Sequence, residues 1–209
     1  MALINHDRGE IQFKVVYCGP PLGGKTTNLY YIHRRLDPRW RGDLVSIATE
    51  QNRTISFDYL PIEAAEANGY NVRFQLYTVP GQKVMRETRK AVLAGADAVV
   101  FVADSDPNRL ESNRTSLDDT FGCLHENRID RAAIPFVFQF NKRDLAGATP
   151  STILDELLKA QTPSFLACAI TGYQIFATLD WTTQQVLQGF YRSIVTKNSN
   201  RRPALEPVV

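Results

Sequence analysis

The stretch "GPPLGGKT", residues 19–26, decides the fold of this chain. Its spacing, a glycine, four residues and then Gly-Lys-Thr, is that of a phosphate-binding loop, whose backbone N–H groups point at phosphate oxygens. Such a loop joins a strand to a helix; here "IQFKVVYC" (11–18) predicts the strand and "TTNLYYIHRRL" (26–36) the helix. The alternative, a glycine-rich turn with a chance lysine, is disfavoured by this context. We therefore expect Lys25 to reach the β- and γ-phosphates of a nucleotide and the Thr26 hydroxyl to bind Mg²⁺.

Short apolar runs alternate with helical patterns along the rest of the chain. Strand-like runs lie at 44–49, 72–79, 97–104, 134–140 and 164–170, and apolar residues at helical spacing follow Asp106-Pro107 and run from Phe176 to Ile194. This alternation predicts an α/β fold with a mostly parallel sheet covered by helices on both faces, and ligands at the carboxyl ends of the strands. We expect one domain over residues 1–196 and a polar, proline-interrupted tail at 197–209, whose composition favours disorder.

Composition narrows the classes of function. The 209 residues are 44% hydrophobic and 22% charged with a net charge of +2, and no long basic run points to nucleic acid. The three cysteines are far apart and form no metal-binding spacing, which favours free thiols in a reducing cytosol. We see no signal peptide, no run of about 18 apolar residues and no lipidation motif. The expected location is the cytoplasm, without a membrane anchor.

A second motif, "NKRD" (141–144), directly follows a predicted buried strand. The Asp144 carboxylate could accept hydrogen bonds from both N1–H and the exocyclic amine of guanine, which adenine does not offer there. A site built for those two bonds rejects the analogue by about 10⁴-fold or more. Asn141 is expected at the imidazole edge of the base, with the Lys142 stem over the ring. Alone the tetrapeptide is usually a charged turn, but its place after a phosphate loop favours guanine recognition.

Two further segments are candidates for sensing the γ-phosphate. "TVPGQ" (78–82) follows a strand; either it is a plain loop breaker, or the Gly81 N–H binds the γ-phosphate and Gln82 orients the attacking water. "TEQNRTISFDY" (49–59) is either a solvated loop, or it gives the Thr54 hydroxyl to Mg²⁺ and Arg53 to the charge that develops in the transition state.

Together these motifs resemble those of the Ras-like small GTPases, and most closely the bacterial MglA family of polarity and gliding-motility GTPases. The resemblance rests on "GPPLGGKTTNL", "NRTISFDYLP", "LYTVPGQ", "VVFVADSDPNRL" and "FNKRDL", and covers residues 11–195. It implies binding of GTP and GDP with Mg²⁺, GTP hydrolysis, a polarity switch, and a GTPase-activating partner of the roadblock (MglB-like) type. It also implies that "ACAIT" (167–171) completes the pocket, with Cys168 beside the base and the Ala169 N–H on the guanine oxygen, although this stretch departs from the common Ser-Ala-Lys form.

Two consecutive prolines stand in a loop that works through N–H groups, which proline lacks. In Ras-like loops the donors begin only after them, so the loop keeps its donors: Leu22, Gly23, Gly24, Lys25, Thr26 and Thr27. Pro21 departs from the glycine usual in the family beside the γ-phosphate and the glutamine. Its side chain is expected to crowd the transition state, which weakens the case for hydrolysis but not for binding.

Thr78 stands where most Ras-like proteins carry an aspartate that supports the metal. Asp58 lies in the apolar run "ISFDYL", where an unpaired carboxylate would be costly to bury, and this run should pair with the strand that ends at Thr78. We hypothesise that Asp58 accepts from a metal-bound water; a turn cap or an arginine partner is the alternative.

Three functions compete at this point. The first is a slowly hydrolysing GTPase switch, with Lys25, Gln82 and Arg53 as catalytic residues. The second is a GTP-binding scaffold with little or no hydrolysis, which Pro21 favours. The third is an ATP-using P-loop kinase, against which Asn141 and Asp144 argue.

Overall fold

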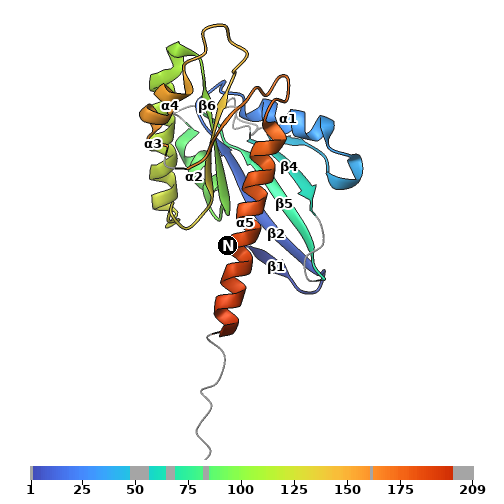
Figure 1. Cartoon of the computed structure of the whole chain (residues 1–209). Coiled ribbons are helices and arrows are strands. Elements are labelled where there is room, and N and C mark those ends of the chain that lie inside the picture. Colours follow the sequence, from blue (N-terminus) through green and yellow to red (C-terminus); the bar gives the residue numbers. More distant parts are fainter. Residues whose placement is uncertain (1, 48–56, 65–68, 82–84, 161, 200–209) are drawn as a thin grey trace, which may run out of the picture.

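The centre of the protein is a twisted β-sheet (Figure 1). The computed structural model describes residues 2–47, 57–64, 69–81, 85–160 and 162–199. Within these residues the sheet has eight strands: β1 (Leu3–Asn5), β2 (Glu10–Cys18), β3 (Val45–Ile47), β4 (Phe57–Glu63), β5 (Asn71–Thr78), β6 (Ala98–Asp104), β7 (Phe136–Asn141) and β8 (Ser164–Leu166).

The strand order is β3-β4-β5-β2-β6-β7-β8, with β1 added to the first half of β2. From β5 to β8 neighbouring strands are parallel, whereas β3, β4 and β1 pair in the antiparallel sense. The register sets Tyr17 beside Thr78 and Asp104 beside Asn141, so the carboxyl ends of the parallel strands meet at one edge. The prediction of a mostly parallel α/β sheet is confirmed.

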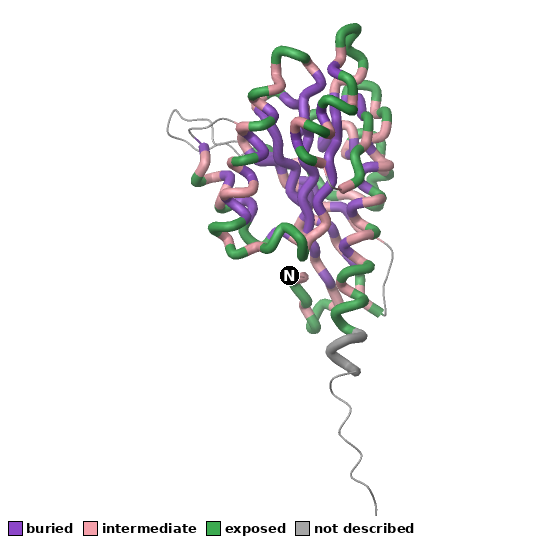
Figure 2. The backbone as a smooth tube through the Cα atoms, turned by 60° about the vertical axis from the view of Figure 1, so that its left-hand side comes forward, coloured by how far each residue is buried: buried purple, intermediate pink, exposed green. Residues whose placement is uncertain are grey.

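Helices cover both faces of the sheet (Figure 1). On one face lie α1 (Lys25–Arg35) and α5 (Ile175–Ser199), and on the other α2 (Arg86–Leu93), α3 (Leu110–Glu126) and α4 (Ser151–Leu158). The described part of the chain also contains the short 3₁₀ turns η1 (Pro38–Trp40) and η3 (Pro107–Arg109). Because both faces are covered, every residue of β6 is buried, which is why its sequence is almost continuously apolar. Figure 2 shows the buried residues concentrated along the central strands.

Some element boundaries differ from those expected. The strand expected at 164–170 ends at Leu166, because the chain turns back at Cys168, whose carbonyl accepts from the Gly172 N–H at 2.8 Å. The helical pattern after Asp106-Pro107 begins with η3, which Asp106 caps by accepting from the Asn108 N–H at 2.9 Å, and continues as α3. Helix α5 continues through Ser199, so it takes in 197–199 of the expected tail; residues 200–209 lie outside the described part.

Three elements were not expected from the sequence: β1, α2 and α4. Strand β1 is three residues long, and α2 and α4 have eight residues each. In α4 only Leu154 and Leu158 are buried, and two apolar positions are too few to establish a helical period. The three cysteines are buried, free thiols.

Candidate nucleotide-binding site

The phosphate loop leaves β2 at Cys18 and enters α1 at Lys25, as its spacing predicts. Two of its glycines have left-handed backbone conformations, with φ of 138° at Gly19 and 97° at Gly24. A Cβ atom at Gly19 would lie 2.2 Å from the carbonyl oxygen of Val102, and one at Gly24 would lie 2.1 Å from Nδ2 of Asn141. Only glycine therefore fits where the loop packs against the ends of β6 and β7.

Lys25 is the buried cation of this loop. Its side chain is 7% exposed, and Nζ donates to the carbonyl oxygens of Gly19 at 3.0 Å and Pro20 at 2.7 Å. Burial lowers the pKa of Lys25 to about 8, because desolvation disfavours the charged amine. An anionic phosphate at this place would stabilise the ammonium form, as the motif predicts.

The consecutive prolines contribute acceptors instead of donors. The Pro20 carbonyl also accepts from the Gly23 N–H at 3.2 Å, and the Pro21 carbonyl accepts from Nη2 of Arg109 at 2.7 Å. Leu22, the next residue, is 83% exposed with φ of 61°. The two prolines therefore fix the shape of the loop through their carbonyl groups. The exposed part of the loop begins at Leu22.

Gly81 lies directly against the proline pair. A Cβ atom at Gly81 would be 2.3 Å from the backbone nitrogen of Pro21 and 2.6 Å from the carbonyl carbon of Pro20. The strand-end glycine turn and the phosphate loop are thus in contact at the position where the sequence places the γ-phosphate sensor. The same contact puts Pro21 next to the residue that precedes Gln82.

Asp58 lies in β4, buried beside β5 as the hypothesis requires. Its Oδ2 accepts from the hydroxyls of Thr26 at 2.6 Å and Thr78 at 2.9 Å, and its Oδ1 accepts from the hydroxyl of Ser46 at 2.7 Å. The backbone N–H of Asp58 donates to Oγ1 of Thr78 at 2.8 Å. Thr78, which has no carboxylate of its own, therefore positions the carboxylate of Asp58.

These groups fit a magnesium ion. Mg²⁺ prefers oxygen ligands and is usually held by one or two carboxylates together with substrate phosphates and water. A threonine hydroxyl that donates its proton to a carboxylate keeps its lone pairs for a metal. Among the described residues, no group of three or more His, Cys, Asp or Glu gathers to hold a metal, so hydroxyl, phosphate and water oxygens would be the direct ligands, with Asp58 accepting from a bound water.

The base-binding motif is tied directly to the phosphate loop. Asn141, buried at the end of β7, donates from Nδ2 to the carbonyl oxygen of Gly23 at 2.8 Å. Its Oδ1 accepts from the backbone N–H of Ala169 at 2.8 Å. The N–H that the sequence assigns to the guanine oxygen already has a protein partner, so a bound base would have to share or replace this bond.

The other two residues expected to contact the base, Lys142 and Asp144, have different hydrogen-bond partners. The exposed Asp144 accepts from Sγ of Cys168 at 3.2 Å, which orients the carboxylate. Lys142 has φ of 65°, and its Nζ donates to Oδ2 of Asp104 at 2.6 Å. The terminal amine is thus anchored at the end of β6 and leaves only the stem of the lysine to contact a ring.

Three sequence-predicted residues, Arg53, Thr54 and Gln82, lie outside the described part of the chain. The structure brings together the remaining ones at the carboxyl edge of the sheet, where Thr27 is exposed in the first turn of α1.

Two residues that support this site, Asp104 and Arg109, were not expected from the sequence. Asp104 is fully buried, is held by Asn113 through its backbone, and lies 3.9 Å from Nε of Arg109. Arg109 in turn reaches the Pro21 carbonyl. A polar residue at the carboxyl end of a buried parallel strand was the signal that could have identified Asp104.

The sequence is also similar to those of known proteins. The sequence model of the ADP-ribosylation factor family matches residues 3–194. The chain is 44% identical over 191 residues, 90% of its length and 96% of the relative's, to the mutual gliding-motility protein MglA of Myxococcus xanthus (strain DK1622). It is 27% identical to ADP-ribosylation factor 3 of Arabidopsis thaliana, over 87% of this chain and 92% of that protein. It is 28% identical to ADP-ribosylation factor-like protein 2 of Drosophila melanogaster, over 87% and 91%.

No helix in the described residues is long and apolar enough to cross a membrane. The family match spans nearly the whole chain, and the phosphate loop and the base-binding motif occupy one edge of a mostly parallel sheet. The chain therefore belongs to the ADP-ribosylation factor family and is a small Ras-like GTPase of the MglA type.

Proposed function

We propose that the protein is a switch that alternates between GDP- and GTP-bound states with Mg²⁺ and hydrolyses GTP slowly. The observation that carries the proposal is the 2.8 Å hydrogen bond from Asn141 to the Gly23 carbonyl. It joins the candidate guanine subsite to the candidate phosphate subsite, so that one nucleotide can occupy both. Asp144 supplies guanine selectivity, since a site built for the guanine donors discriminates strongly against adenine.

The metal site of the proposal uses Thr26, Thr54 and Asp58. When bound, Mg²⁺ neutralises charge on the β- and γ-phosphates. The Thr26 hydroxyl donates to Asp58 and keeps its lone pairs for the metal. Asp58 then takes the role of the strand-end carboxylate that Thr78 cannot supply, by accepting from a metal-bound water.

The catalytic part of the proposal assigns charge stabilisation to Lys25, orientation of the attacking water to Gln82, and an arginine finger within the chain to Arg53. Gly81 donates its N–H to the γ-phosphate. Unassisted Ras-like proteins hydrolyse GTP at about 10⁻⁴ s⁻¹, and we expect an intrinsic rate of this order.

The first experiment identifies the nucleotide that co-purifies with the protein and then measures competition between GTP and ATP. We expect guanine nucleotide and weak competition by ATP, and we expect Asp144→Ala to lose the preference. Equal affinity of the wild type for ATP and GTP would overturn the assignment. Single-turnover hydrolysis by the wild type and by Arg53→Ala then tests the finger: the variant should lose stimulated turnover and keep its GTP affinity.

A GTP-binding scaffold without useful hydrolysis is the second candidate. It is favoured by the close approach of Gly81 to Pro21, which leaves little room beside the γ-phosphate. Pro21→Gly separates the two: a faster rate in the variant supports crowding by Pro21, and unchanged intrinsic and stimulated rates remove that argument.

We further propose that the switch acts in the cytoplasm, controls cell polarity or motility, and is stimulated by a roadblock-type (MglB-like) partner. The support is the 44% identity to a protein named for mutual gliding motility. The test is phosphate release with and without a purified roadblock-domain protein from the same cell. Stimulation that depends on Gln82 supports the partner, and an unchanged rate contradicts it.

A further inference from the structure

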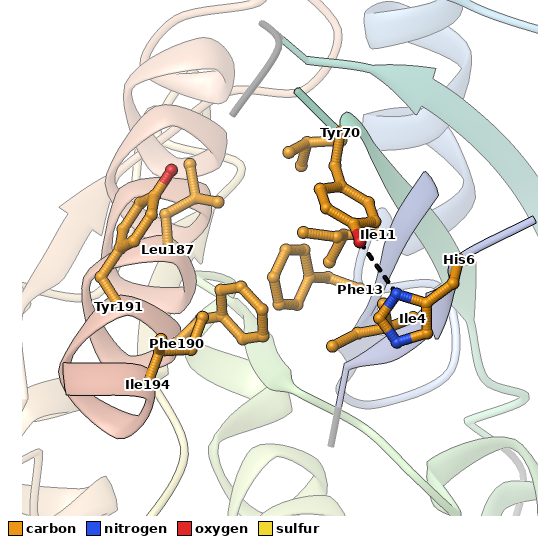
Figure 3. A pocket seen from close by; sticks show the side chains of 10 residues that line it. Ile4, His6, Ile11, Phe13, Tyr70, Leu187, Phe190, Tyr191 and Ile194 are labelled. Atoms are coloured by element: carbon orange, nitrogen blue, oxygen red, sulfur yellow. Dashed lines mark hydrogen bonds between the residues drawn. The ribbon is translucent and has the colours of Figure 1, made fainter. Parts of the chain in front are cut away.

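An apolar groove, whose lining side chains are drawn in Figure 3, lies beside β1 and α5. Figure 1 shows β1 at the opposite end of the sheet from the carboxyl ends of the parallel strands. The groove has a cavity volume of about 210 Å³ and lies between the β1–β2 hairpin and the last turns of α5. We call this feature the α5 groove; its main apolar lining residues are Ile4, Ile11, Phe13, Leu187, Phe190 and Ile194.

The floor and one rim of the α5 groove are fixed by internal contacts. Phe13 is buried and meets Phe190 edge to face, with ring centroids 5.3 Å apart. At the rim, Nδ1 of His6 and the Tyr70 hydroxyl form a hydrogen bond of 2.8 Å, which Figure 3 shows as a dashed line. A groove with such walls is already shaped before an occupant binds, which lowers the cost of binding.

The upper walls of the α5 groove are open to solvent. Ile4 is 42% exposed, Tyr191 38% and Ile194 36%. Covering adjacent exposed apolar side chains around a cavity removes apolar area from water, which is favourable in free energy, so such a surface is a candidate binding site.

The sequence supplies an occupant at the right place. Ten residues, "NRRPALEPVV" (200–209), follow the last residue of α5, and four of them are alanine, leucine or valine. The family match ends at residue 194, so these ten residues lie beyond the part shared with the family. Ser199 is five residues past Ile194, which is about 7.5 Å along a helix axis, and ten extended residues reach about 33 Å. The tail is thus long enough to reverse direction and return to the groove.

We propose that the apolar end of this tail, residues 204–209, folds back and fills the α5 groove of its own chain. Pro203 and Pro207 restrict the unfolded tail and so reduce the entropy lost on docking. A short tether gives the tail an effective concentration in the millimolar range, which favours its own groove over that of a second copy. Arg201 and Arg202 lie in the reversing segment, where their charges stay in water.

Photo-crosslinking of the full chain tests the contact. Leu205 is replaced by p-benzoylphenylalanine, and the protein is irradiated at low micromolar concentration. We expect crosslinks to peptides from residues 3–13 or 187–194 in a band of monomer mass. The same probe at Arg201 is the matched control and should give at most a small fraction of that yield. A dimer-mass product, crosslinks elsewhere in the chain or no crosslink from position 205 would each overturn the proposal.

Substitutions on the groove side sharpen the test. Ile194→Asp adds a charge to an exposed groove wall and should reduce the crosslink yield at least several-fold, whereas Gln188→Asp on an exposed, non-lining position of α5 should not. In hydrogen exchange, Leu205→Asp should speed exchange in residues 187–194, and Glu206→Ser should leave it unchanged. Equal exchange in wild type and Leu205→Asp contradicts docking even if a crosslink forms.

Discussion

At the scale of single residues, Lys25 carries the clearest electrostatic signature. Its pKa is lowered to about 8 because the amine is buried, so part of the population is neutral near that pH. A bound phosphate favours the charged form and raises the pKa. We predict proton uptake by Lys25 on GDP binding near pH 8 and none by this residue near pH 6, where the amine is already charged.

Calorimetry in two buffers of different ionisation enthalpy measures this uptake. Affinity should fall as pH rises above about 8, by at most tenfold per pH unit for one proton. Lys25→Arg keeps a cation that does not titrate in this range and should abolish the proton uptake associated with this position. Uptake that persists unchanged in Lys25→Arg would assign the linkage to another group.

Asp58 is the residue on which the metal proposal depends. Three hydroxyls donate to its carboxylate, and Thr26 is one of them. We predict that Asp58→Asn speeds nucleotide release in Mg²⁺ about tenfold or more, because a neutral amide accepts weakly from metal-bound water. In EDTA its release should match the wild type.

Glu63→Gln is the matched control for Asp58→Asn, because Glu63 lies at the far end of the same strand and pairs with Arg73. It should leave the Mg²⁺ dependence unchanged. Release of a labelled GDP is the measurement, and wild-type Mg²⁺ dependence in Asp58→Asn would mean that hydroxyls, phosphates and water hold the metal alone.

At the scale of elements, the glycine turn after β5 and the phosphate loop after β2 are in direct contact through Gly81 and the proline pair. A methyl group at Gly81 would meet backbone atoms, which cannot rotate away, so one of the two loops must shift. Overpacking of this kind costs about 1–3 kcal/mol.

We predict that Gly81→Ala lowers GTP affinity about tenfold or more while GDP affinity changes little, because in the proposed switch the Gly81 N–H contacts only the γ-phosphate. Gly147→Ala is the control, since a Cβ atom there meets nothing within 4 Å. Competition of a non-hydrolysable GTP analogue against labelled GDP gives both affinities. An equal loss for GDP would indicate that the substitution distorts the phosphate loop as a whole.

At the scale of the whole molecule, the site lies where the parallel strands β2, β5, β6 and β7 end together. A nucleotide that contacts several of these ends is lost on global unfolding, so binding must stabilise the domain. At a free ligand concentration of 100 times Kd the gain is about 2.7 kcal/mol, which corresponds to a rise in Tm of roughly 5–10 °C for a domain of this size.

We predict such a rise for nucleotide-free protein with GDP and Mg²⁺, and little change with ATP at the same concentration. Differential scanning fluorimetry measures it. Asp144→Ala is the matched variant and should lose most of the difference between the two nucleotides. Equal shifts for GDP and ATP in the wild type would remove guanine selectivity from the proposal.

Several features of this protein follow from the sequence alone because their signals are local. The phosphate loop is marked by glycines and a lysine between a strand and a helix, and the buried strands 97–104 and 134–140 are marked by unbroken apolar runs. The pairing of the Asp58 strand with the strand that ends at Thr78 also followed, because consecutive strands usually lie side by side.

Only the tertiary structure decided which side chains meet. Asn141 binds the Gly23 carbonyl across 118 residues of sequence, and Arg109 binds the Pro21 carbonyl across 88. Such contacts depend on strand order, register and rotamer, and no local pattern encodes them. The same holds for the hydrogen bond between the Lys142 amine and Asp104. It also holds for the α5 groove, which exists only because the first and last elements of the domain pack side by side.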